Sequence, residues 1–245
     1  MEKFLVYLLY KVGTNWRLIF TGIALVLVIL LLSGSTTWVD AFYFKVVDNA
    51  ADRGAITVAN DTFDCPLTKD CSLTKVVYLK QGWEPSDSLW YYNTTQGSDL
   101  LPYDFFFVLE QEKSKELFRA PENMNRFRYL PQKKTRSNPD ALPVGMVADT
   151  YRRRKYMGFT CAACHASQVN YKGTGIRIDG GPSAADMDTF MHELQSALEA
   201  AFADPPKHKR FVDNVLKLPH YRNAEDLWLR HYSNAEEVEK DLKRT

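Results

Sequence analysis

The sequence contains few cysteines and no excess of charge of either sign. Its 245 residues include four cysteines, too few for a small domain held together mainly by disulfides. The 31 Lys and Arg residues against 30 Asp and Glu residues give a formal net charge of +1, whereas nucleic-acid-binding domains are usually strongly basic. Hydrophobic residues make up 45% and charged residues 25%, proportions that exclude a disordered chain. We therefore expect a folded protein that does not bind nucleic acid.

One long hydrophobic run lies near the N-terminus. Residues 18–38 begin LIFTGIALVLVILLL, and at a rise of about 1.5 Å per residue this segment would span about 31 Å, the thickness of a bilayer core. Trp16 and Trp38 bracket it, as interfacial anchors do. Basic residues within 1–17 and acidic residues after the run predict a cytoplasmic N-terminus. We expect a single-pass anchor in a bacterial inner membrane, with the main domain in the periplasm. A cleaved signal peptide and a buried core helix are the alternatives.

The chain after this run is predicted to form a loop-rich exported segment, 39–92, and a domain, 93–245. A short extended piece is expected at Val76–Lys80. Cys65 and Cys71 are six residues apart, and no histidine follows either of them. In an oxidising compartment, a local disulfide between them is the simplest interpretation.

Residue periodicity predicts the local structure of the domain. Ile176–Asp179 alternates as a short strand does and stops at a Gly-Gly-Pro sequence. A helix is expected next, with Ser183 as its N-cap, and two more helices at 207–218 and 224–243. The basic, proline-punctuated segment 123–143 is expected to be a surface loop. The apolar stripe of the first helix comprises Met187, Phe190, Met191, Leu194, Leu198 and Ala201. These patterns predict a mainly α fold.

The sequence Cys161-Ala-Ala-Cys164-His165 is the most specific motif in the chain. On a helical turn, residues i, i+3 and i+4 share one face, so two thiols can meet the vinyl groups of one porphyrin and the imidazole can reach its iron. This spacing is that of c-type haem attachment. A redox-active CxxC pair would be expected in a thioredoxin-like βαβ unit, and a zinc site would need a second ligand pair. We therefore predict one covalent haem c with His165 as the proximal iron ligand.

The second axial ligand of the iron is left open by the sequence. The possible donors are Met146, Met157, Met187, Met191, His192, His208, His220 and His231, and a position without a protein ligand is equally compatible with the motif. The basic run at 152–155, Arg-Arg-Arg-Lys, is typical of a solvated face. It is also a candidate docking patch for an acidic redox partner, or a counter-charge for the haem propionates. Arg177 is a second candidate for binding a propionate.

Five stretches between Thr95 and Leu216 carry a family resemblance. They read TQGSDLLPYDFF, NRFRYLP, SNPDALPVGM, GFTCAACHASQVNYKGTGIRIDGGP and FADPPKHKRFVDNVL. Over about half of its length, the chain resembles the dihaem cytochrome c peroxidase-like family that includes the rubber oxygenases. The resemblance implies an exported, mostly helical protein and maps Cys161, Cys164 and His165 onto the first of two haems. In the rubber oxygenases this first haem binds dioxygen on its open side.

The 245 residues contain no second CxxCH sequence. We therefore expect either a part of a longer protein or a single-haem relative of this family. The first hypothesis is a membrane-anchored c-type cytochrome that transfers electrons to a redox partner protein or a membrane complex. The second is a haem enzyme of the oxygenase or peroxidase type with a vacant iron position, and the third is an assembly subunit. No catalytic residue is assigned.

Overall fold

The computed structural model describes residues 53–57, 73–135, 137–219 and 229–245. Helix makes up 37% and strand 21% of this part of the chain, and the strands form two three-stranded sheets. The protein is therefore mixed α/β, and the expectation of a mainly α fold is wrong. The strands that were not predicted form hairpins whose tips are polar, so they lack the continuous apolar alternation on which a strand prediction depends.

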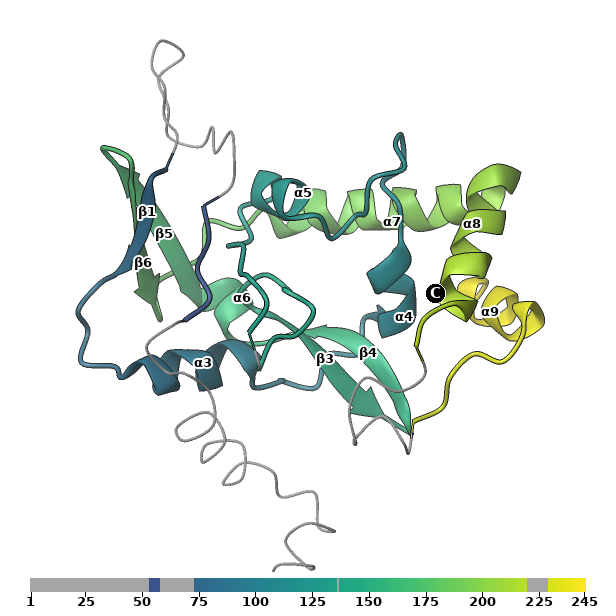
Figure 1. Cartoon of the computed structure of the whole chain (residues 1–245), viewed down its shortest axis with the longest axis horizontal. Coiled ribbons are helices and arrows are strands. Elements are labelled where there is room, and N and C mark those ends of the chain that lie inside the picture. The colour runs from purple at the N-terminus through teal and green to yellow at the C-terminus, as the bar shows by residue number, and fades with distance from the viewer. Residues whose placement is uncertain (1–52, 58–72, 136, 220–228) are drawn as a thin grey trace, which may run out of the picture.

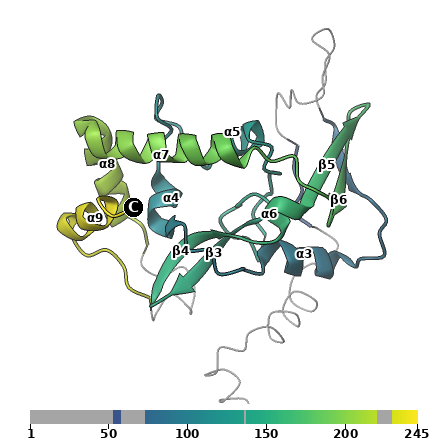
Figure 2. The same ribbon diagram turned by 180° about the vertical axis from the view of Figure 1, so that it is seen from behind.

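The elements are arranged around α6, a short helical turn that contains most of the CxxCH motif and lies in the middle of the molecule (Figures 1 and 2). In chain order they are β1 (Lys75–Tyr78), α3 (Pro85–Asn93), β2 (Leu101–Pro102), α4 (Tyr103–Val108), α5 (Pro121–Arg126), β3 (Met146–Tyr151), β4 (Arg154–Phe159), α6 (Ala162–His165), β5 (Ala166–Tyr171), β6 (Thr174–Asp179), α7 (Met187–Ala203), α8 (Pro205–Leu216) and α9 (Ala235–Leu242). The sheet with β5 and β6 lies at one end and helices α8 and α9 lie at the other.

The first sheet has the strand order β1-β6-β5, with β1 parallel and β5 antiparallel to the central strand. Both strands expected here from the sequence, near 76–80 and 176–179, are confirmed by β1 and β6. Burial alternates along β6, so that Gly175, Arg177 and Asp179 face inward. The inner face of this sheet thus carries two charged side chains, which is unusual for a buried surface.

The second sheet has the order β2-β4-β3 and consists mainly of the β3–β4 hairpin. Its two-residue turn is formed by Arg152 and Arg153, which have φ angles of 48° and 69°. Strand β4 runs through Gly158, where a Cβ atom would lie 2.3 Å from the carbonyl oxygen of Ser98. The strand leads through Thr160 directly into α6, so this hairpin positions one end of the motif.

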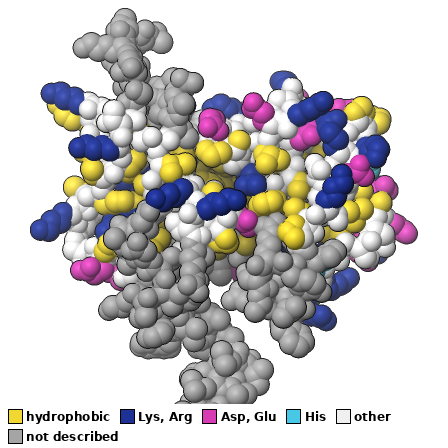
Figure 3. Space-filling view, viewed as in Figure 1, with side chains coloured by type: hydrophobic (Ala, Val, Ile, Leu, Met, Phe, Trp, Pro, Cys, Tyr) yellow, Lys and Arg dark blue, Asp and Glu magenta, His cyan; other side chains and the backbone are white. Residues whose placement is uncertain are grey.

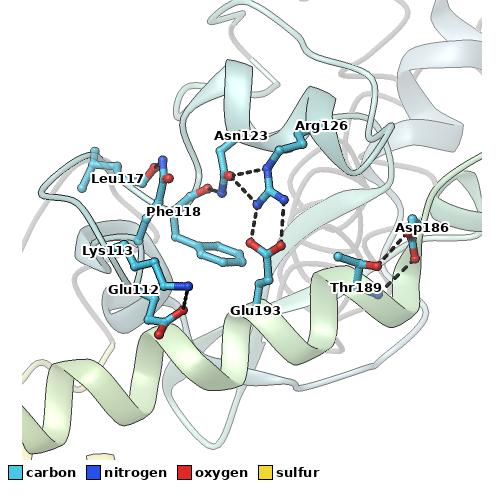
Figure 4. Close-up of polar contacts among 10 residues, drawn as sticks. Glu112, Lys113, Leu117, Phe118, Asn123, Arg126, Asp186, Thr189 and Glu193 are labelled. Carbon is cyan, nitrogen blue, oxygen red and sulfur yellow. Dashed lines mark hydrogen bonds and ion pairs between the residues drawn. The ribbon is translucent and has the colours of Figure 1, made fainter. Parts of the chain in front are cut away.

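An aromatic cluster forms the centre of the main core. The ring centroid of Phe190 in α7 lies 5.1–6.1 Å from the ring centroids of Phe118, Phe127, Tyr129 and Phe159. Aromatic pairs at these distances stabilise a core. The N-cap of α7 is Asp186, whose carboxylate accepts a hydrogen bond from the amide of Thr189 (Figure 4). The predicted N-cap, Ser183, is therefore wrong by three residues.

The apolar side of α7 agrees largely with the predicted stripe. Phe190, Leu194 and Ala201 are buried, and Ala197 joins them, whereas Met191 is 40% exposed. At the edge of this buried side, the helix is joined to α5 by the ion pair of Arg126 with Glu193 (Figure 4). The helix ends at Ala203, and α8 begins two residues later at Pro205.

The segment 123–143 is not the surface loop that its basic residues suggested. Phe127, Tyr129 and Leu142 are between 1% and 5% exposed. Within this segment, the side-chain amide of Asn138 accepts a hydrogen bond from the amide of Leu142 and donates one to its carbonyl oxygen. Because these bonds satisfy the main chain of a turn inside the protein, the apolar side chains beside it can enter the core.

Two predictions concern residues that the structure does not describe. The segment 18–38, predicted to be the membrane anchor, lies outside the described residues, as do Cys65 and Cys71. Within the described ranges, no helix has the length and apolar character needed to cross a membrane. The expected single-pass location in a bacterial inner membrane is therefore not supported, and we withdraw it.

Candidate functional site

The CxxCH motif forms a short helical turn between the two sheets. Cys161 is the N-cap residue of α6, with helical dihedral angles of φ −57° and ψ −27°. The amide of His165 donates a hydrogen bond of 3.0 Å to the carbonyl oxygen of Cys161, and the amide of Ala163 donates one of 3.0 Å to that of Thr160. The helical turn assumed from the spacing is thus present, and β5 begins directly after it.

The two sides of this turn have opposite environments. Ala162 and Ala163 are each 2% exposed, whereas Cys161, Cys164 and His165 are all exposed. The two small alanines allow the turn to lie directly on the neighbouring main chain. The haem-binding residues predicted from the sequence are therefore brought together on one accessible surface.

Gly145 is the residue on which the buried side of the turn rests. Its φ angle is +89°, and a Cβ atom there would lie 2.3 Å from both Cα and N of Ala163. The carbonyl oxygen of Gly145 accepts a hydrogen bond of 2.9 Å from the amide of Thr160. Only glycine combines this backbone conformation with so close an approach, so the position of the motif depends on this residue.

The three motif side chains are not used to hold the fold. Both thiols are free, and within the described residues neither they nor the imidazole of His165 make a hydrogen bond or an ion pair. The same part of the chain contains no group of three or more His, Cys, Asp and Glu side chains arranged to hold a metal ion. A buried structural cysteine or a hydrogen-bonded structural histidine would be expected if these residues served only packing.

Tyr91 of α3 fixes the end of the motif turn. Its hydroxyl donates a hydrogen bond of 2.9 Å to the carbonyl oxygen of His165, and its ring contacts Trp83 edge to face at 5.3 Å. Burial, together with the nearby Cys161 and Asp179, raises the pKa of Tyr91 to about 12. The hydroxyl therefore stays protonated and remains a donor at neutral pH.

Three buried side-chain atoms in the described part of the chain have no hydrogen-bond partner: Tyr78 Oη, Tyr129 Oη and Arg177 Nη1. All three belong to the surroundings of the motif. Tyr78 packs against the small apolar cluster that contains Ala162. Burial raises the pKa of Tyr129, and the nearby Cys164 adds to this effect. Buried polar groups usually have a partner. The exposed thiols and the exposed imidazole of the turn are the groups that fit a covalently attached haem.

Asp179 forms a buried polar centre that the sequence did not reveal. It is 4% exposed and accepts hydrogen bonds from Ser88 Oγ at 2.6 Å and from the hydroxyl of Tyr92. The guanidinium of Arg53 lies 3.7 Å away. Burial raises the pKa of Tyr92 far above its ordinary value, and its hydrogen bond to Asp179 acts in the same direction. The inward position of Asp179 in the alternating strand was the signal available in the sequence.

Arg177, predicted as a propionate-binding residue, lies on the inner face of β6 and has no exposed surface. Its Nη2 donates to Gln168 Oε1 at 3.2 Å and to the carbonyl oxygen of Pro131 at 3.4 Å. Both acceptors are uncharged. The structure thus places the predicted residue inside the protein, beside the first sheet.

The possible axial ligands lie in varied environments. Met146 and Met157 are buried in the main core, and Nδ1 of His192 donates a hydrogen bond to the carbonyl oxygen of Asp188. His208 lies 3.5 Å from Glu239. His220 lies outside the described residues.

The basic run 152–155 occupies the tip of the β3–β4 hairpin. Arg154 forms an ion pair with Asp241 of α9 and lies over the ring of Tyr232 at 4.2 Å, so this arginine joins the hairpin to the C-terminal helix. On the face seen in Figure 3, Lys and Arg side chains are distributed among acidic and hydrophobic ones rather than gathered in one patch.

A groove of about 550 Å³ lies beside α7. Its apolar lining includes Leu100, Met191, Leu194, Leu198, Phe202 and Leu242. No residue of the CxxCH motif lines it, so this groove is not the site that the motif indicates.

Comparison with known proteins gives one informative match. The chain is 28% identical over 176 residues to y4iJ of Sinorhizobium fredii (strain NBRC 101917 / NGR234), a protein described as uncharacterized. The match covers 63% of this chain and 29% of y4iJ. The chain thus corresponds to less than a third of that relative. No protein-family model matches the chain, and no solved structure does.

Proposed function

We propose that the protein is a c-type cytochrome that carries one haem on α6 and transfers electrons to a redox partner protein. Cys161 and Cys164 would attach the haem, and His165 would be its proximal iron ligand. The observation that carries the proposal is the separation of roles within the turn. Alanines and main-chain groups hold it in place, while the three motif side chains are exposed and make no other polar contact.

Each thiol would add across one vinyl group of the porphyrin, with a C–S bond formed to one vinyl carbon and a hydrogen transferred to the other. The bound iron would supply one-electron oxidation and reduction. His165 must be neutral to bind iron, and its exposed ring is available for this. Tyr91, bound to the carbonyl oxygen of His165, restrains the main chain from which that ring projects.

Electron transfer is the proposed role because the motif lies at the surface. A haem edge held there is accessible to a second protein, and no acid–base or nucleophilic constellation elsewhere in the described chain indicates a different reaction. The resemblance to dihaem peroxidase-like proteins supports haem binding in the same stretch of residues.

The first test is covalent haem attachment. The full chain is produced together with a cytochrome c maturation system, denatured, and stained for haem after gel electrophoresis. We expect staining of the wild type, weaker retention in Cys161→Ala and Cys164→Ala, and loss of a normal c-type spectrum in His165→Ala. Tyr171→Phe, which changes a side chain of β5 that is 61% exposed and lies outside the motif, is the control and should leave the spectrum unchanged. An absence of covalent haem in the wild type would overturn the proposal.

The effect of carbon monoxide on the ferrous absorption spectrum then distinguishes an electron-transfer protein from a haem enzyme. A ferrous spectrum that carbon monoxide does not change would indicate two filled axial positions and support electron transfer. A clear change would indicate an accessible iron and would replace this role with an oxygen- or peroxide-using enzyme.

A further inference from the structure

The outer face of the sheet formed by β1, β6 and β5, at one end of the molecule (Figure 1), is apolar. Residues 175, 177 and 179 of β6 face inward, so the alternate residues face outward, and the ladders place their partners in β1 and β5 on the same face. Leu79 continues the ladder of β1, because its amide donates a hydrogen bond of 2.8 Å to the carbonyl oxygen of Arg177. We call this surface the aliphatic face; it consists of Val77, Leu79, Val169, Ile176 and Ile178.

The side chains of the aliphatic face are unusually exposed. Val169 is 51%, Leu79 47% and Val77 38% exposed. Val77 and Val169 pair with Ile176 from opposite sides, so one row of the sheet is aliphatic across all three strands. The solvent side of a sheet is normally polar. A contiguous apolar patch with a polar rim instead marks a site of interaction.

Lysines surround the aliphatic face. Lys75 begins β1, Lys80 follows this strand, and Lys172 lies in the turn between β5 and β6; all three are exposed. The segments 75–80 and 166–179, which the structure describes throughout, contain one acidic residue, Asp179, and it is buried. The rim of the face is therefore positively charged. The surface that complements it has carboxylates around an apolar centre.

The aliphatic face begins beside the CxxCH turn. Strand β5 starts directly after His165, and Ser167, which is opposite Ile178, lies on its outer side. Two residues of extended chain span about 7 Å, so a protein seated on the sheet is close to the exposed motif. The basic tip of the β3–β4 hairpin has no such relation, because Arg152 precedes Thr160 by eight residues, or about 26 Å of extended chain.

The size and shape of the face favour a transient contact with a protein. Three strands about 4.8 Å apart and about six residues long present roughly 300 Å². A stable complex buries about 800 Å² on each partner, whereas encounters between redox proteins are smaller. Valine and isoleucine on a sheet form a flat surface, unlike the amphipathic helix that typically inserts into a membrane. A second copy placed face to face would bring lysines against lysines.

We propose that the aliphatic face and its lysine rim are the docking surface for an acidic electron-transfer protein, which presents carboxylates around an apolar centre. The inference rests on the proposed function for the electron that this partner exchanges, whereas the surface itself follows from the exposed aliphatic and lysine side chains. The lysines steer and orient the partner, and the aliphatic side chains provide the contact from which water is excluded.

The test measures the binding of a plant-type ferredoxin, an acidic one-electron carrier, to the full chain by isothermal titration calorimetry. Lys172→Glu reverses a charge at a turn position with a φ angle of 48°, and Arg152→Glu makes the same change at the same φ angle in the other hairpin. We expect Lys172→Glu to raise Kd about 2- to 30-fold at low ionic strength, and Arg152→Glu, the matched control, to leave it unchanged. Equal effects would show attraction by net charge alone and would overturn the proposal, as would a wild type that does not bind.

Val169→Thr tests the apolar part of the surface. Threonine keeps the shape and strand preference of valine but places a hydroxyl in the contact, so Kd should rise about fivefold. This effect should persist in 1 M salt, whereas that of Lys172→Glu should disappear, because the Debye length is then only about 3 Å. Unchanged affinity of Val169→Thr would show that the partner does not contact the aliphatic face and would contradict the proposal.

Electron transfer is measured separately from binding. When reduced ferredoxin is mixed with the oxidised protein, one electron passes between them, and the second-order rate constant should fall in Lys172→Glu and Val169→Thr. If the wild type attached no haem, the proposed function would fail, but calorimetry would still decide whether the docking surface exists. Binding to phosphatidylserine-containing vesicles, weakened by the same two substitutions and without binding of ferredoxin, would identify a membrane-facing surface and overturn the proposal.

Discussion

Substitution of Gly145 by alanine should be the most damaging single-methyl change in the motif region. The residue has a φ angle of +89°, a conformation that costs a residue with a Cβ atom about 1–2 kcal/mol. The new methyl carbon would also lie 2.3 Å from the main chain of Ala163, so α6 would have to move. Overpacking of this kind costs about 1–3 kcal/mol more, which gives a total of about 2–5 kcal/mol.

Gly180→Ala is a matched control for the backbone contribution. Gly180 has a φ angle of +76°, but nothing lies within 4 Å of the position of its Cβ atom. We therefore expect this substitution to lower the free energy of unfolding by about 1–2 kcal/mol only. Urea denaturation of both variants and the wild type, followed by tryptophan fluorescence, measures the difference.

The comparison isolates the contact between Gly145 and the motif. If the two variants lose equal stability, the turn does not rest on Gly145 and the described geometry is refuted. Gly145→Ala should additionally reduce covalent haem yield, because it displaces the turn that presents the thiols. Gly180→Ala should leave this yield near that of the wild type.

Two further changes test the surrounding structure. Arg153→Gly should stabilise the protein by about 1 kcal/mol, because the turn requires a φ angle of 69° and glycine relieves the left-handed strain; a lower thermal midpoint would refute the strain. Glu110→Gln should destabilise it by about 1.5–3 kcal/mol at neutral pH, since Glu110 binds Arg210 through both oxygens and also pairs with Lys207. Hydrogen bonds from Arg210, followed by those from Lys207, hold the pKa of Glu110 below its ordinary value of 4.5. A carboxyl with a lowered pKa stabilises the fold above 4.5 and loses this effect as the pH falls, so wild type and variant should converge in acid denaturation curves.

The sequence predicted those elements whose signal is local. Strand β6 and helix α7 were found because each buries one face at its own period, with Phe190 and Leu194 on the buried face of the helix. The β3–β4 hairpin was missed because its turn contains Arg152 and Arg153 instead of the Asn-Gly type of sequence that marks such turns. The two strands are buried at the end away from the turn rather than at alternate residues, so they added no period-2 pattern.

In the candidate site, too, only the residues with a local sequence signal could be predicted. Cys161, Cys164 and His165 are adjacent in sequence, so their common face followed from helical geometry alone. The contact between Ser88 and Asp179 joins residues 91 positions apart, and the hydrogen bond from Tyr91 to His165 joins residues 74 positions apart. Neither has a local signal, because both depend on how the first sheet is folded onto α3.

The contacts around α6 explain why this turn is suited to hold a group that is not part of the chain. The turn is fixed by hydrogen bonds to its main chain, among them one of 2.8 Å from the amide of Ser183 to the carbonyl oxygen of Cys164. Because none of these bonds uses a motif side chain, the thiols and the imidazole can form bonds elsewhere at no loss to the fold.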